Sequence, residues 1–382
     1  MWALTKAFGI WPCLFIAFAA SVSAVCECGF SVAVDPVGDS SFSVFTELFE
    51  TDFLHSTNLA DAHWLRQQYS VNSSDSRGPY GKNFTTSDVV TNPLKDPYSW
   101  AGDSIHGGDA GLQLWAREPI NSMIPAAEIS ANRTDILYGS FRVGMKMSKV
   151  NGTCGAFFWF RNDSQEIDME FLSSEFHLPS NPNTGAVNLV VQTPASLQAG
   201  YDASGTPDFV ESNLTFSPDT AFHEYRFDWS PGRVAFYADS YCLHIMNVSI
   251  PNSPGDLVLN HWSNGDPKWS GGPPAADTAV TVSYVKAYFN STDPAKQADY
   301  RKRCPTYNVK KTCAVPEQRD PPDPAGPNGN ETAKTYFFSL DHPPATSGCR
   351  AHGMGVAFAV LVVVLSTVRA VRLLRWVCGI AW

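Results

Sequence analysis

Short segments of alternating polar and apolar residues fill the chain between Gly139 and Asn290, and Gly, Pro, Asn and Asp separate them. No stretch of this region keeps a helical period over ten residues. This pattern predicts many short strands and therefore a β-sandwich or barrel. Residues 30–92 are less regular, and we expect long surface loops there. The predicted strands cover residues 111–117, 140–147, 155–161, 166–172, 186–193, 223–229, 233–239, 241–246, 257–262 and 280–289.

Both ends of the chain are apolar. Residues 1–24 have a basic start, an apolar stretch and a small-residue cleavage pattern, which predict a signal peptide. Residues 351–382 hold about 18 uncharged residues followed by arginines, and we expect a C-terminal membrane anchor. A membrane span and a lipid-anchor signal remain open, because Ser347 and Gly348 suit a lipid attachment site. We expect the protein on the outer face of the plasma membrane or in the cell wall.

The segment 314–350 is dense in Pro, Asp, Asn and Gly, and we expect an extended linker there. What remains, residues 25–313, is long enough for one large catalytic domain. The chain carries 27 basic and 37 acidic residues, a net charge of −10. This charge argues against nucleic-acid binding, which needs a basic face. We expect a monomer.

The cysteines and glycosylation motifs fit an oxidising compartment. Cys304 and Cys313 are close in sequence and are expected to form a disulfide, whereas Cys26, Cys28, Cys154 and Cys242 could form two more pairs of unknown connectivity. No Cys/His cluster has the ligand spacing of a zinc site, so no metal is expected. Nine N-x-Ser/Thr motifs begin at Asn72, Asn83, Asn132, Asn151, Asn162, Asn213, Asn247, Asn290 and Asn330.

Acidic and apolar residues alternate strictly in the segment Gln165-Glu166-Ile167-Asp168-Met169-Glu170-Phe171-Leu172. On a strand the three acids share one face and the apolar residues share the other. Like charges in a row repel each other, so a solvated edge strand is the simple alternative. Glycoside hydrolysis, however, needs one ionised and one protonated carboxyl group. The segment therefore indicates Glu166, Asp168 and Glu170 as catalytic residues.

This segment resembles the E-[ILV]-D-x-E signature of glycoside hydrolase family 16. Residues 152–163, 222–240 and 257–273 are also similar to family patterns, and the resemblance spans roughly residues 46–290. It implies an all-β jelly-roll sandwich of the concanavalin A type, with a substrate groove across its concave sheet. Gln165 stands where many members have Asp. The single residue between Asp168 and Glu170 makes plain β-1,3-glucanase activity less secure.

The resemblance implies that Glu166 is the nucleophile and Glu170 the general acid/base of a retaining double displacement, with Asp168 tuning the pair. Trp159, Trp262 and Trp269 are expected substrate contacts, and His177 could line the groove. Core packing is an equal alternative for Trp159. No cofactor is expected; structural calcium occurs in the family, but no Asp-rich loop requires it.

The expected function is endo-acting hydrolysis or transglycosylation of cell-wall β-glucan of the β-1,3/1,4 type, in a fungal cell-wall enzyme. An alternative is chitin–glucan crosslinking, in which chitin is the acceptor. A lectin-like sandwich is the alternative of another class, and a structural adhesin is a third. The intact acidic triplet speaks against a lectin, which has no need of a proton-sharing pair.

Overall fold

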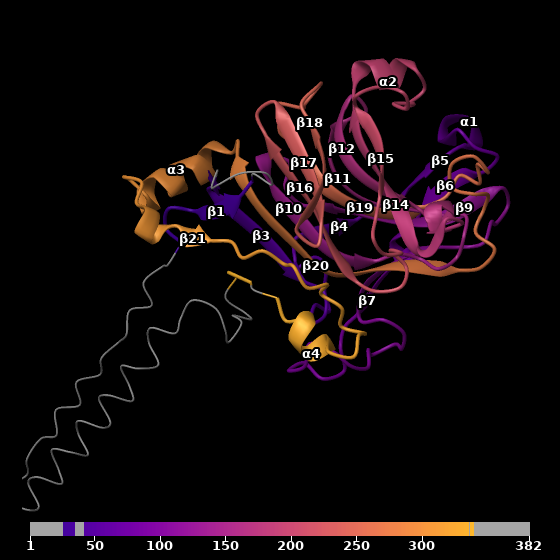
Figure 1. Cartoon of the computed structure of the whole chain (residues 1–382), viewed down its shortest axis with the longest axis horizontal. Helices are drawn as coiled ribbons and strands as arrows, with labels where there is room; N and C mark the ends of the chain where they lie inside the picture. Colours follow the sequence, from indigo (N-terminus) through magenta and orange to yellow (C-terminus); the bar gives the residue numbers. More distant parts are fainter. Residues whose placement is uncertain (1–25, 35–41, 336, 340–382) are drawn as a thin grey trace, which may run out of the picture.

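The computed structural model describes residues 26–34, 42–335 and 337–339 (Figure 1). Two large β-sheets carry the fold. One follows the order β18-β17-β16-β10-β20-β8-β7, with β3 also paired to β20. Its strands are β3 (Glu47–Asp52), β7 (Val89–Asn92), β8 (Gly111–Ala116), β10 (Ile136–Lys146), β16 (His223–Ser230), β17 (Arg233–Ala238), β18 (Tyr241–Met246) and β20 (Thr278–Ser291). We call it the outer sheet.

The other sheet follows the order β13-β14-β12-β11-β19-β9-β6-β5, with β15 on β14 and β4 on β9. We call it the groove sheet. Its strands are β4 (Trp64–Arg66), β5 (Tyr69–Val71), β6 (Gly81–Phe84), β9 (Met123–Ala131), β11 (Cys154–Asn162), β12 (Gln165–Leu172), β13 (Phe176–Leu178), β14 (Asn181–Gln192), β15 (Phe209–Asn213) and β19 (Asp256–Trp262). The expected all-β jelly-roll sandwich is confirmed.

Short elements complete the described chain. A small sheet joins β2 (Phe42–Phe45), β1 (Phe30–Ala33) and β21 (Cys313–Ala314). The helices are α1 (Ser73–Ser76), α2 (Pro194–Gln198), α3 (Pro294–Arg303) and α4 (Gly329–Thr332), with 3-10 turns at Thr86–Asp88, Ser173–Glu175 and Val309–Lys311. α1 and α2 lie at the upper edge of Figure 1, and α4 lies at the lower edge.

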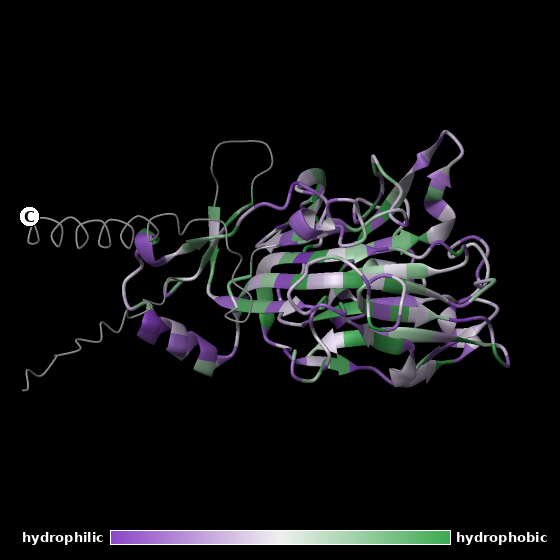
Figure 2. Cartoon of the chain, turned by 90° about the horizontal axis from the view of Figure 1, so that it is seen from below, coloured by the Kyte–Doolittle hydropathy of each residue, from purple (hydrophilic) through white to green (hydrophobic). Residues whose placement is uncertain are grey.

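The core fills the space between the two large sheets. The alternating strands place one set of side chains inside and the other outside, which appears as green and purple bands along the strands in Figure 2. Phe157 of the groove sheet packs at 5.3 Å from Phe227 of the outer sheet, between ring centroids. Trp159 and Trp229 meet at 4.4 Å, and both are fully buried. Aromatic contacts between the layers thus fix their spacing.

Each strand predicted from the sequence is present, with bounds that differ by a few residues. Sequence patterning missed β9, which lies beside β19 in the groove sheet. Its sequence MIPAAEISA has a proline and several alanines, which are poor strand formers. The expectation of long loops over residues 30–92 is wrong in part, because that region supplies seven short strands, β1 to β7.

The disulfides differ from the expected pairing. Cys26 is bonded to Cys313, and Cys28 is bonded to Cys304. The predicted Cys304–Cys313 bridge is therefore wrong. The parallel pairing of β1 with β21 brings the two ends of the domain together, so each cysteine has a partner more than 270 residues away. Cys154 is a buried free thiol and Cys242 an exposed one, so neither forms the pair considered for them.

The segment predicted as an extended linker is ordered on the outer sheet as far as residue 339. Val315, Ala333 and Phe337 are buried. The Glu317 carboxylate accepts a hydrogen bond of 2.7 Å from Arg226, and Lys286 Nζ donates to the Thr335 hydroxyl. We call residues 315–335 and 337–339 the C-terminal strap. The linker prediction is wrong for the strap, because polar partners on the sheet order a segment that lacks a core of its own.

Some predictions concern residues outside the described part of the chain. These are the signal peptide 1–24, the anchor 351–382 and the end of the expected linker. Among the residues that the structure describes, no helix is long and apolar enough to cross a membrane.

Candidate active site

Strand β12 carries the acidic segment and pairs antiparallel with β11 and β14. Its alternation divides the strand as the sequence predicts. Ile167, Met169 and Phe171 are at most 1% exposed and belong to the inter-sheet core. Glu166, Asp168 and Glu170 point to the opposite side and line a cavity on the outer face of the groove sheet. The apolar face therefore fixes the direction of the acidic one.

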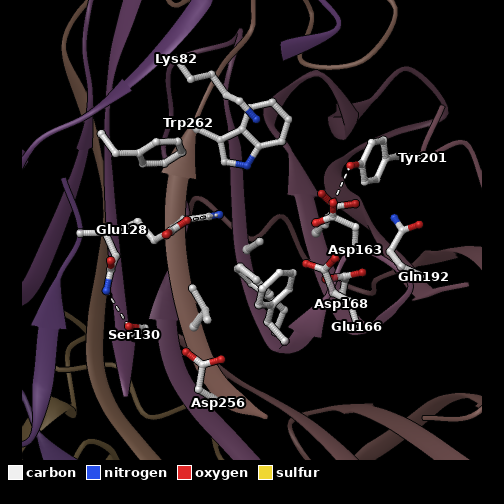
Figure 3. Close-up of a pocket in the computed structure, with 18 of the residues that line it drawn as sticks. Lys82, Glu128, Ser130, Asp163, Glu166, Asp168, Gln192, Tyr201, Asp256 and Trp262 are labelled. Carbon is white, nitrogen blue, oxygen red and sulfur yellow. Dashed lines mark hydrogen bonds between the residues drawn. The ribbon is translucent and has the colours of Figure 1, made fainter. Parts of the chain in front are cut away.

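We call this cavity the first cavity; its volume is about 430 Å³. Figure 3 shows Glu166 and Asp168 side by side at its floor, with Glu128 across the sheet and Trp262 and Lys82 at one end. Aromatic side chains from neighbouring strands complete the walls. These include Tyr69, Phe84, Phe158 and Phe160. The mix of acidic and aromatic groups suits a neutral polar ligand with apolar faces, such as a sugar.

A second cavity, of about 410 Å³, adjoins the first. The two share five lining residues: Arg77, Glu170, Gln192, Tyr201 and Trp262. Glu166 and Asp168 line the first cavity alone, whereas Lys268 and Trp269 line the second alone. The acidic row of β12 thus crosses from one cavity to the other, with Glu170 at the boundary.

Burial and proximity set the protonation of the acidic row. Burial raises the pKa of Asp168 far above its usual range, and the charges of Glu166 and Glu170 raise it further. Burial also raises the pKa of Glu166, but a hydrogen bond with Asp168 opposes that rise. These directions fit a protonated Asp168 whose carboxyl O–H donates a hydrogen bond to the Glu166 carboxylate. Asp168 thereby favours the ionised form of Glu166.

Glu170 has a different environment. Burial raises its pKa to about 7, and the charges of Arg77 and Lys82 limit that rise. The Cys154 thiol donates a long contact of 3.8 Å to Glu170 Oε1. At neutral pH Glu170 is therefore divided between its acid and base forms, as a group that must give and take a proton requires. Arg77 directly follows α1, and Lys82 lies on β6. Both elements are on the far side of the groove from β14.

Two expected substrate contacts lie in the groove. Trp262 lines both cavities, and Lys82 Nζ lies 4.1 Å from the centroid of its ring. Trp269 lines the second cavity and packs against the cluster that contains Trp262. Both side chains are placed where a sugar ring can stack on them.

Two other expected contacts lie elsewhere. Trp159 points into the core, and its indole N–H donates to the Ile136 carbonyl, because β11 turns alternate residues inward. The prediction that Trp159 contacts substrate is wrong. His177 bonds Asp219 at 2.9 Å and the Pro182 carbonyl at 2.7 Å, and it lines neither cavity. These bonds hold His177 beside the β13–β14 turn, and its groove role stays a prediction.

Sequence patterning missed Glu128, Asp256 and Lys82. Glu128 lies on β9, and the Tyr69 hydroxyl donates to it at 3.1 Å. Burial raises the pKa of Glu128, and it raises that of Asp256 to about 6. Each is a single charged residue in a strand, and only the strand order shows that it faces the acidic row. The only local indication of a site residue among these three was Glu128, a charged residue within a mostly apolar segment.

In the parts of the chain that the structure covers, no cluster of three or more His, Cys, Asp or Glu side chains could hold a metal ion. The acidic row brings carboxyl groups with different surroundings together in one groove. Glycoside-cleaving sites are built on such a pair of carboxyl groups.

A family model described as glycosyl hydrolases family 16 matches residues 96–286, half of the chain, and the chain belongs to this family. A β-glucanase of Paenibacillus polymyxa is 28% identical over 181 residues, which are 45% of this chain and 68% of that protein. A xylanase/β-glucanase of Ruminococcus flavefaciens is 26% identical over 201 residues, which are 50% of this chain and 23% of that protein.

Two solved structures are also similar. The β-glucanase of Bacillus licheniformis matches with a TM-score of 0.47 and 19% identity, over 63% of this chain and 97% of that one. A Crh5 transglycosylase without ligand matches with a TM-score of 0.45 and 17% identity, over 65% of this chain and 86% of that one.

Proposed function

We propose that this protein is a retaining, endo-acting glycosidase that hydrolyses or transglycosylates cell-wall β-glucan. The observation that carries the proposal is the placement of Glu166, Asp168 and Glu170 together in one open groove. The two adjoining cavities share Glu170, so a sugar chain that occupies both would place one of its inner bonds beside the acidic row. Family membership and the β-glucanase relatives support the same substrate class.

The reaction begins with attack by Glu166 on the anomeric carbon. A bond forms between the Glu166 carboxylate and that carbon while the glycosidic C–O bond breaks, and Glu170 gives its proton to the leaving oxygen. The hydrogen bond with Asp168 favours the ionised form of Glu166, against the burial that raises the pKa of Glu166 to about 8. This first step releases the leaving sugar and leaves a glycosyl-enzyme.

The second step reverses these roles. Water or a sugar hydroxyl enters, and Glu170 takes its proton. The oxygen of that water or hydroxyl bonds to the anomeric carbon while the bond from this carbon to Glu166 breaks. Two inversions give net retention. Water gives hydrolysis, and a sugar hydroxyl gives transglycosylation. A chitin oligosaccharide is one acceptor to test.

Substitution of the two glutamates tests the assignment. We expect Glu170→Gln to lower kcat on mixed-linkage β-glucan by about 10²–10⁴-fold, the usual contribution of a general acid. Glu166→Gln should abolish turnover and keep sugar binding. Glu175→Gln is the matched control, because Glu175 is half-buried and near the row but lines neither cavity.

Azide separates the two roles. With an activated β-glucoside donor, Glu170→Ala should regain activity in azide and give a β-glycosyl azide, because Glu166 still forms the covalent intermediate. Glu166→Ala should give the α-glycosyl azide by a single displacement. Sugar binding with no bond cleavage in the wild-type protein, on any β-glucan, would instead make the chain a lectin-like binder.

The location and modification of the protein are also part of the proposal. We infer a secreted glycoprotein held at the outer membrane face or wall by its C-terminal region. Support comes from the predicted signal peptide, the nine glycosylation motifs and the two disulfides, which persist in oxidising compartments. Fractionation of cells that express the full chain, with and without a lipid-anchor-specific phospholipase, tests the tether and its type.

A further inference from the structure

The two walls of the groove touch each other between Arg77 and Tyr201. Arg77 follows α1, and its guanidinium carbon lies 4.5 Å from the centroid of the Tyr201 ring. Arg77 also donates a hydrogen bond of 2.9 Å to the Gly200 carbonyl. The Tyr201 hydroxyl donates at 2.8 Å to Asp163, in the turn between β11 and β12 (Figure 3). Three segments far apart in sequence therefore meet at one point on the groove.

This contact lies at the boundary of the two cavities. Arg77, Tyr201 and Glu170 line both cavities. In the proposed reaction Glu166 attacks the sugar in the first cavity, and Glu170 protonates the oxygen that leaves. The leaving sugar therefore lies in the second cavity, past Arg77 and Tyr201. This step rests on the proposed function.

Both residues have unusual backbone conformations. Arg77 has φ of 60° and Tyr201 has φ of 66°, in the left-handed region that non-glycine side chains rarely adopt. A strained residue persists when its surroundings hold it, and such residues gather at ligand-binding sites. The side chains of Arg77 and Tyr201 are thus presented to each other by two separately strained loops.

We propose that Arg77 and Tyr201 form a clasp that binds the sugars on the leaving side of the scissile bond. An exposed cation–π contact is weak, and a sugar hydroxyl can replace the Gly200 carbonyl as the acceptor of the Arg77 hydrogen bond, so a polymer can displace the contact. The guanidinium donors of Arg77 and the ring of Tyr201 then face the sugar that occupies the second cavity. Because an acceptor sugar enters where the leaving sugar departs, the clasp also selects the acceptor.

Two substrates that differ only on the leaving side test this proposal. Both are β-glucan oligosaccharides with the same sugars before the cleaved bond. One has one glucose unit after that bond and the other has three. Analysis of the products confirms that the same bond is cleaved in both. For wild-type protein kcat/KM is expected to be higher with the longer leaving group. Arg77→Ala and Tyr201→Ala should each reduce that gain about two- to tenfold, the effect of losing one hydrogen bond or one aromatic contact to the sugar.

Two variants serve as controls. Tyr201→Phe keeps the ring and should keep most of the gain. Arg301→Ala, on the exposed face of α3 and away from the groove, should leave both substrates unchanged. In Tyr201→Ala the shorter substrate should retain its kcat/KM, which shows that the protein is folded and the carboxyl groups are intact. Arg77→Ala also removes a charge that lowers the pKa of Glu170, so for this variant the ratio of kcat/KM between the two substrates is the readout.

An undiminished gain in both alanine variants would overturn the clasp and leave the proposed function standing. Equal losses on both substrates would also overturn it, because Arg77 would then act through Glu170 rather than on the leaving sugar. Failure of the wild-type protein to cleave either substrate would sink the proposed function and the clasp together.

Discussion

At the scale of single residues, Lys82 shows how the groove affects the pKa of Glu170, the proposed general acid. The side chain comes from β6, stacks over Trp262 and contributes a positive charge that lowers the pKa of Glu170. Burial lowers the pKa of Lys82 itself. A cation held beside a carboxyl group favours the carboxylate, so Lys82, together with Arg77, lowers the pH at which Glu170 loses its proton.

Replacement of Lys82 by Met should therefore extend activity to higher pH. Without the cation the pKa of Glu170 rises, the acid form persists, and the basic limb of kcat/KM against pH moves up by roughly one unit. Lys82→Arg keeps the charge and should leave the limb in place. A limb that stays fixed in Lys82→Met would show that this charge does not reach Glu170.

The sequence predicted the residues of the site that lie on one strand and missed those brought by other strands. Glu166, Asp168 and Glu170 were visible because strand alternation puts them on one face. Lys82 and Glu128 have no local pattern, and their position depends on β9 lying beside β19 and β6 lying beside β9. The prediction that Trp159 contacts substrate failed for a related reason. The sequence alone does not show whether an aromatic residue on a strand faces the core or the groove.

At the scale of elements, the direction of the acidic row depends on the packing of β12 and β14. Met169 and Leu189 are paired across these two strands, and both are fully buried. A shift of one residue in this register would turn the three acids into the core. The apolar side chains between the sheets therefore hold the acidic row in the groove.

Truncation of Leu189 should reveal this support. Leu189→Ala removes buried methyl groups and leaves a cavity, so the free energy of unfolding should fall by about 2–5 kcal/mol. Leu197→Ala makes the same chemical change on α2, where the side chain is 37% exposed, and should cost less than about 0.5 kcal/mol. Urea unfolding of both proteins measures the difference, and equal losses would contradict a packed inter-sheet core at Leu189.

At the scale of the whole molecule, the C-terminal strap covers a charged surface. Arg142 and Arg226 lie on the outward side of the outer sheet, since their neighbours Phe141 and Phe227 fill the core. Each arginine is only 1% exposed, because the strap passes over it. The disulfides Cys26–Cys313 and Cys28–Cys304 join the start of the domain to the chain just before the strap.

Composition could not predict this arrangement. A segment rich in Pro and Asp has too little apolar surface to fold alone, which is the reasoning behind the linker prediction. The partners that order the strap are charged residues of β10 and β16, more than 90 residues earlier in the chain. Alternation in those strands indicates an outward face, but it does not show what covers that face.

Glu317 is the strap residue whose loss should matter most. It accepts from Arg226 at 2.7 Å and from Arg142 at 3.4 Å, so Glu317→Ala leaves two buried guanidinium groups short of an acceptor. Hydrogen bonds to charged groups contribute about 1.5–3 kcal/mol, and we expect a loss of unfolding free energy in that range. Glu331→Ala removes the same group from an exposed position on α4 and should change little. If urea unfolding gives both variants the stability of the wild-type protein, the strap is not part of the cooperative fold, and the domain ends near Ala314 as its composition suggests.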